Sequence, residues 1–124
     1  MSKLGKGSVF VVGALAALTV AVTGAFGGPA KSTATTVAVT SGKPSEFKFT
    51  LSKKIVPKGV TTFKVVNRGA ISHDFKIAGK KTPSLKTGKT ATIRATFAKA
   101  GKYAYLCTLP GHAAAGMKGV LVVK

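Results

Sequence analysis

The chain after residue 36 alternates apolar residues with polar or small ones at a period of two, which is the pattern of half-buried β-strands. The alternation recurs in short stretches, namely 37–39, 47–51, 60–66, 74–77, 91–97, 103–107 and 120–123. Turn-forming segments such as Asn67-Arg-Gly69 and Lys99-Ala-Gly101 separate these stretches. About seven short strands in roughly 100 residues predict an all-β fold, either an antiparallel sandwich or a barrel.

The first 28 residues follow a different pattern. Lys3 and Lys6 precede an uncharged run of apolar and small residues, and the next charge is Lys31. This order is typical of a secretory signal peptide, which we assign to residues 1–28. The run also reaches the roughly 20 residues that span a bilayer, so an uncleaved membrane anchor at residues 8–26 is the alternative. Both interpretations predict an exported protein, periplasmic or on the extracellular face of the membrane, with a linker at 29–36 and a domain at 37–124.

The charge of the chain is strongly unbalanced. Twenty Lys and Arg residues face 2 acidic ones, giving a net charge of +18, and loss of Lys3 and Lys6 with a signal peptide would leave +16. The only carboxylates are Glu46 and Asp74, so paired-carboxylate or triad catalysis has almost no residues to draw on.

The single cysteine, Cys107, has no intramolecular partner although disulfides persist in exported proteins. The thiol is therefore buried and inert, joined by a disulfide to another molecule, or bound to a ligand.

A candidate metal site surrounds this cysteine. Cys107, His112 and Met117 follow one another at intervals of five residues in a segment rich in Gly and Ala, and His73 lies 34 residues before Cys107. Taken singly, a Cys or Met is most simply a core residue. Taken together, two His and one Cys with a weak axial Met form the ligand set of a type 1 copper site. Imidazole and thiolate suit Cu(II), and the sulfur ligands suit Cu(I).

At these residues the chain resembles the cupredoxin (blue copper) family, which includes plastocyanin- and azurin-like proteins. The resemblance runs from about Val37 to Lys124 and rests on four motifs: Asn67-Arg-Gly-Ala-Ile-Ser-His73-Asp-Phe75, Gly101-Lys-Tyr-Ala-Tyr-Leu-Cys107, Pro110-Gly-His112 and Gly116-Met-Lys-Gly119. It implies a Greek-key β-sandwich with one copper ion near one end, held by His73, Cys107, His112 and Met117. It also implies that Tyr103 forms the tyrosine corner of the family.

The surroundings of the site carry further expectations. We assign Asn67, Asp74 and Thr108 to the shell around the ligands, and we expect Asp74 to accept a hydrogen bond from Thr108. Many relatives have Asn in place of Asp74, and azurins have Gly in place of Ser72, so an azurin-like axial carbonyl is not implied. An uncharged electron-transfer port around His112 is expected from small or apolar residues, namely Leu109, Pro110, Gly111, Ala113 and Ala114.

The resemblance implies a carrier that moves single electrons between larger redox proteins through a Cu(I)/Cu(II) couple. Copper storage or delivery is the alternative, because the same ligands would serve it. We expect no enzyme, since copper oxidases and nitrite reductases need further copper centres with many more histidines. The basic charge suggests redox partners with an acidic docking surface, or an anionic envelope surface. Nucleic acid is not an expected partner, because the lysines are scattered and the chain carries an export signal. We expect a monomer.

Overall fold

The computed structural model describes residues 34–124. The predicted signal or anchor segment, residues 1–28, lies outside the described residues. The first strand begins at Thr35 and so includes the last two residues of the expected linker. Within residues 34–124, no helix is long and apolar enough to cross a membrane.

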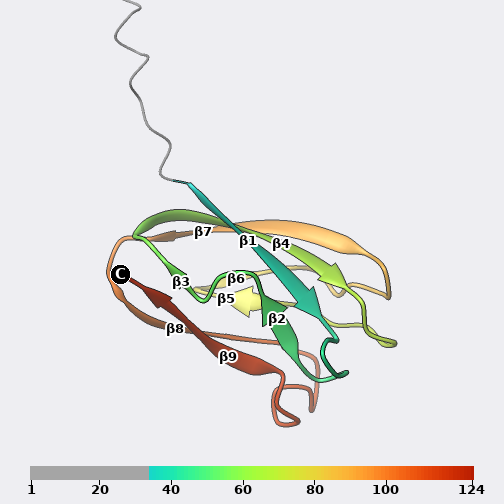
Figure 1. Cartoon of the computed structure of the whole chain (residues 1–124). Helices are drawn as coiled ribbons and strands as arrows, with labels where there is room; N and C mark the ends of the chain where they lie inside the picture. Colours follow the sequence, from blue (N-terminus) through green and yellow to red (C-terminus); the bar gives the residue numbers. More distant parts are fainter. Residues whose placement is uncertain (1–33) are drawn as a thin grey trace, which may run out of the picture. The chain divides into compact units, whose positions relative to one another are not determined.

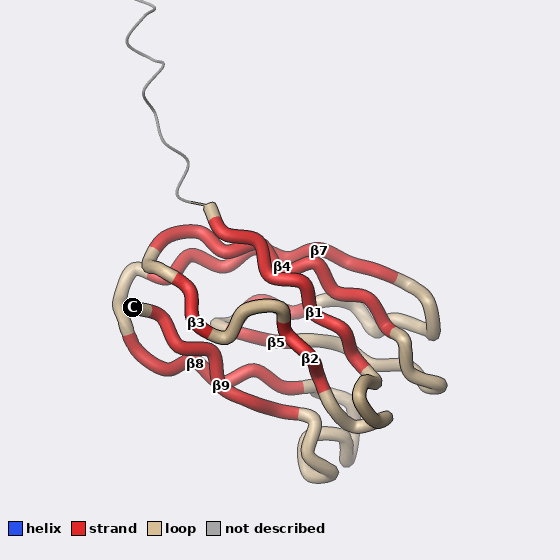
Figure 2. Tube along the Cα trace, viewed as in Figure 1, coloured by secondary structure: helices blue, strands red, loops and turns tan. Residues whose placement is uncertain are grey.

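The described residues form two sheets packed face to face (Figure 1). Figure 2 shows that residues 34–124 form strands and the loops that join them. In sheet order, the four-stranded sheet contains β2 (Phe49–Leu51), β1 (Thr35–Ser41), β4 (Gly59–Asn67) and β7 (Thr90–Phe97). The five-stranded sheet contains β3 (Ile55–Val56), β9 (Lys118–Val123), β8 (Gly101–Leu106), β5 (Lys76–Ile77) and β6 (Lys80–Lys81).

The expected sandwich is confirmed, but its pairing is mixed rather than purely antiparallel. Strand β1 runs parallel to β4, with Val37 opposite Phe63, and β3 runs parallel to β9. The remaining pairs are antiparallel. The chain passes from one sheet to the other between β2 and β3 and back between β3 and β4. Such crossings let strands far apart in sequence pair in the same direction, and residue alternation carries no information about strand direction.

The core is formed by the inward face of each strand, as the alternation predicts. In β4, Thr61, Phe63 and Val65 are buried while Lys64 is exposed. Aromatic rings join the two sheets, because Phe63 of one sheet contacts Phe75, which precedes β5 of the other, at a centroid distance of 5.4 Å. The hydroxyl of Tyr103 donates a hydrogen bond of 2.7 Å to the Lys99 carbonyl, which is the contact expected of a tyrosine corner.

Three loops gather at the end of the sandwich opposite the C-terminal residue (Figure 1). They join β1 to β2, β4 to β5, and β8 to β9. The second and third of these loops carry the predicted ligands, so the fold brings together residues that are far apart in sequence.

Replacement of Phe63 by Ala is expected to lower the free energy of unfolding by about 3–5 kcal/mol, because the ring is fully buried between Phe75 and Phe97. Denaturant unfolding of the metal-free protein measures this change. Val120→Ala is the control, because Val120 is 47% exposed on β9 and its truncation should change stability by about 0.5 kcal/mol or less. Equal losses for the two variants would contradict the placement of the core.

Candidate metal centre

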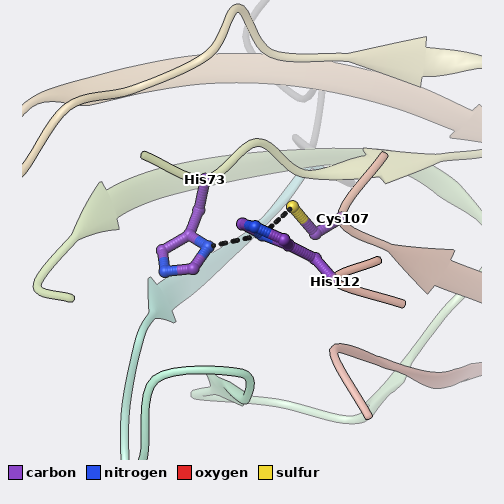
Figure 3. Close-up of side chains that lie close together, drawn as sticks. All are labelled: His73, Cys107 and His112. Carbon is purple, nitrogen blue, oxygen red and sulfur yellow. Dashed lines mark hydrogen bonds between the residues drawn. The ribbon is translucent and has the colours of Figure 1, made fainter. Parts of the chain in front are cut away.

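The structure brings three of the four predicted ligands together. The ligand atoms of His73, Cys107 and His112 all lie within 4.8 Å of one another. Figure 3 shows the three side chains pointing toward a common point. The Nδ1 atom of His112 lies 3.2 Å from Nδ1 of His73 and 3.4 Å from Sγ of Cys107.

These separations fit a single metal ion. Three donors at about 2.0 Å (nitrogen) and 2.3 Å (sulfur) from a metal in a trigonal plane are separated by roughly 3.5–3.7 Å, taking the bond lengths known for zinc. Atoms that each offer a lone pair come this close when a proton or a cation lies between them. Two imidazoles and one thiolate suit copper, whereas Mg²⁺ and Ca²⁺ require oxygen ligands.

The loop between β8 and β9 holds Cys107, His112 and Met117 through its own backbone. The Cys107 amide donates to the Met117 carbonyl, and the Met117 amide donates to the His112 carbonyl, both at 3.1 Å. Gly111 and Gly116 have positive φ angles of 81° and 114°, which favour glycine and allow the tight turns. Met117 is fully buried, and its backbone bonds to Cys107 and His112 keep it in the same loop as these two ligands, so it could supply a thioether to a metal held there.

The upstream ligand is held by a buried amide. Asn67, at the end of β4, is fully buried and its Nδ2 donates to the carbonyls of Ile71 and Leu85 at 2.8 and 2.7 Å. Its Oδ1 accepts from the Gly69 amide at 2.8 Å. His73 itself exchanges two backbone hydrogen bonds with Leu85. Asn67 therefore fixes the path of the segment that carries His73 through hydrogen bonds to its backbone.

Asp74 links the two ligand segments. Its Oδ1 accepts a hydrogen bond of 2.6 Å from the Thr108 amide, and its Oδ2 accepts from the Thr108 hydroxyl, as expected. Lys81 also approaches this carboxylate, with 3.7 Å between Nζ and Oδ2. The Asp74 amide lies 3.5 Å from Sγ of Cys107 and donates toward it.

Burial raises the pKa of the Cys107 thiol, and the amides of Asp74 and Leu109 only partly oppose this effect. The metal-free protein therefore holds a protonated thiol at neutral pH, and a metal must displace that proton to bind sulfur.

Sequence reasoning missed Glu46 as a residue of the site. Its Oε2 lies 2.6 Å from Nε2 of His73, on the side of the ring that faces away from the other ligands. The carboxylate also accepts hydrogen bonds from the amides of Ala70 and Ile71. These contacts, led by the Ala70 amide, lower the pKa of Glu46. The only available signal was that a chain with 20 basic residues contains just 2 acidic ones.

The residues of the predicted port lie along the outer part of the β8–β9 loop. Pro110, Gly111 and Ala114 are exposed, whereas Leu109 and Ala113 are half-buried. His112 is also half-buried, in contrast to the fully buried His73 and Cys107. The ring of Phe47, another residue that sequence reasoning did not assign to the site, packs edge-on against His112 at a centroid distance of 5.0 Å.

The fold and these side chains define a cupredoxin. The profile of the Cupredoxin-like domain family matches residues 10–123, and the chain belongs to this family. The chain is 30% identical over 95 residues to the copper-resistant cuproprotein CopI of Vibrio cholerae. That match covers 58% of this chain and 56% of CopI, so the chain spans a little over half the length of this curated relative.

Solved structures of an auracyanin and of rusticyanin share the fold. Dithionite-reduced auracyanin of Roseiflexus castenholzii is 26% identical, with a TM-score of 0.54, and the match covers 77% of this chain and 99% of auracyanin. Rusticyanin of Thiobacillus ferrooxidans is 24% identical, with a TM-score of 0.60, over 76% of this chain and 79% of rusticyanin. The sandwich is therefore the cupredoxin fold predicted from the sequence.

Metal uptake is expected to release one proton per molecule near neutral pH, because the Cys107 pKa is raised and the thiol must ionise to bind. Affinity should then rise about tenfold per pH unit between about pH 7 and 8, below the thiol pKa. Zn(II), which has no redox chemistry, is a suitable probe with a pH indicator in weak buffer. Cys107→Ser should release no proton in this range. Tight binding to the parent protein without proton release would show that the thiolate is not a ligand.

Proposed function

We propose that this chain is an exported one-electron carrier with a single type 1 copper ion held by His73, Cys107, His112 and Met117. The observation that supports this most is the convergence of two imidazoles and one buried thiol within 4.8 Å at one end of a cupredoxin sandwich. Copper supplies a one-electron couple when it is bound at such a ligand set.

The contribution of the chain is to keep the ligands in place in both oxidation states. His73, Cys107 and Met117 are fully buried, and the backbone of each is hydrogen-bonded to a neighbouring segment. A site with this support needs little rearrangement when the charge of the metal changes. His112 is the most exposed of the four residues, so we propose that electrons pass through its ring and the port of small residues around it.

We propose no catalytic activity for this chain. The sequence contains 2 histidines, and both converge on the candidate metal centre. A second metal centre for catalysis would have neither imidazole nor thiolate left.

The physiological partner is proposed to be a redox protein with an acidic docking surface. Lys48 and Lys118 are exposed next to the β8–β9 loop, and a side chain at Gly116 would lie 3.2 Å from Nζ of Lys48. The carboxylates of Glu46 and Asp74 are occupied by contacts within the centre. The charge available to a docking partner is therefore almost entirely positive, which favours an anionic protein or envelope surface.

Copper storage or delivery is the second candidate, supported by the similarity to CopI, whose name describes a copper-resistant cuproprotein. The rate of electron self-exchange between oxidised and reduced molecules separates the two functions. A carrier should exchange rapidly, whereas a storage protein has no need to do so.

Loading the protein with Cu(II) is expected to give an intense blue colour and the paramagnetic resonance spectrum of a copper–thiolate site. Cys107→Ser should lose the colour, because the bond to sulfur produces it, while Thr96→Ser, an exposed change of similar size on β7, should keep it. A colourless parent protein, or a blue Cys107→Ser variant, would contradict the proposed ligand set.

Electrostatic steering predicts opposite effects of salt on two small oxidants. The rate with an anionic oxidant should fall, and that with a cationic one should rise, between about 0.01 and 0.15 M salt, where the Debye length shrinks from about 30 to about 8 Å. Lys48→Gln should weaken both dependences more than Lys54→Gln, because the Lys54 backbone pairs with Val122 at the other end of β9. Reaction rates that do not change with salt concentration would contradict electrostatic steering.

A further inference from the structure

The carboxylate of Glu46 forms a three-point contact with the segment that carries the upstream ligand. It accepts hydrogen bonds from the amides of Ala70 and Ile71, the shortest being 2.8 Å, and lies 2.6 Å from Nε2 of His73. Glu46 belongs to the loop between β1 and β2, so this contact joins a third loop to the metal centre. Its side chain is 29% exposed, while that of His73 is completely buried.

The contact determines which nitrogen of His73 carries the proton. A carboxylate accepts hydrogen bonds, so Nε2 must donate to Glu46. In a neutral imidazole, Nδ1 is then left with its lone pair, and Nδ1 is the atom that faces His112 and Cys107. Glu46 thus holds His73 in the tautomer that a metal ion requires.

Space for this contact depends on Gly69. A Cβ atom at residue 69 would lie 2.3 Å from Oε2 of Glu46 and 2.9 Å from Nε2 of His73, and both distances are too short for any side chain. The absence of a side chain at this position therefore allows the carboxylate and the imidazole to meet.

Charge adds a second effect to this orientation. A carboxylate that accepts a hydrogen bond from a metal-bound imidazole makes the ligand more basic. Its negative charge also attracts Cu(II) more strongly than Cu(I), and the attraction is only partly screened when one partner is buried.

We propose that Glu46 is a positioning residue of the metal centre, which orients His73 and favours Cu(II) over Cu(I), thereby lowering the reduction potential. This inference rests on the proposed function as a type 1 copper protein. Glu46 is neither one of the four candidate ligands nor one of the surrounding residues predicted from the sequence, namely Asn67, Asp74 and Thr108.

The central test is Glu46→Gln in the copper-loaded protein. Glutamine has nearly the same shape and can still accept hydrogen bonds through Oε1, but it has no charge. Competition titrations with Cu(II) and with Cu(I) give the two dissociation constants. We expect the Cu(II) constant to increase about tenfold relative to the Cu(I) constant, within the range known for changes around metal ligands. A tenfold change corresponds to a potential about 59 mV higher for a one-electron couple.

Two further variants separate the effect of the Glu46–His73 contact from the effect of the protein's net charge. Gly69→Ala keeps the Glu46 charge but forces the carboxylate away from Nε2. It should therefore raise the ratio of the Cu(II) to the Cu(I) dissociation constant, as Glu46→Gln does. Thr96→Lys makes the net charge more positive by one unit, as Glu46→Gln does, but at an exposed position on β7 that is paired with Val60 and lies away from the centre. It should leave the ratio within twofold of the parent value.

The outcomes distinguish this inference from the proposed function. A parent protein that is not blue, or does not cycle, contradicts the function itself. A blue, cycling parent with an unchanged ratio in Glu46→Gln overturns the role of Glu46 alone, even if the variant is less stable. Should Glu46→Gln fail to fold, proton NMR of the diamagnetic Cu(I) parent decides the question. A deshielded, exchange-protected proton on Nε2 of His73 supports the contact, and its absence overturns it.

Discussion

The two hydrogen bonds from Thr108 to the Asp74 carboxylate are the interaction on which the metal centre depends. Asp74 follows His73 directly, and Thr108 follows Cys107 directly, so these bonds tie together two ligand segments that are 34 residues apart in sequence. The sandwich alone brings the loops to the same end, but the packing of two sheets does not set loop positions to within an ångström. A buried carboxylate with directional partners supplies that precision.

Both carboxylates of the chain are used in this way. Asp74 joins the segment of His73 to that of Cys107, and Glu46 joins the β1–β2 loop to the segment of His73. The negative charge is thus concentrated at the centre, whereas the lysines of residues 34–124 lie on exposed positions of strands and loops. In the proposed function this separation serves two purposes. The inner charges balance a metal cation, and the outer charges attract an anionic partner.

The sequence predicts the features that depend on short-range patterns. Alternation predicted that β4 and β8 are strands with one buried face, because such a strand must repeat every two residues. The spacing of Cys107, His112 and Met117 identified three candidate ligands, because one loop carries them all. Glu46 was missed because its partner is 27 residues away and no local pattern links them. The parallel pairing of β1 with β4 was missed for the same reason, since strand direction depends on crossings between the sheets.

Access to the centre is unequal on its different sides, and this constrains both candidate functions. His73, Cys107 and Met117 are completely buried, and Phe47 packs against both imidazoles. Among the candidate ligands only His112 is partly exposed, so a metal ion and an electron would both reach the centre from the side of the β8–β9 loop. A redox partner docked on that loop would cover the route for metal exchange. Electron transfer and copper delivery would therefore exclude each other while a partner is bound, because both would use the same exposed imidazole.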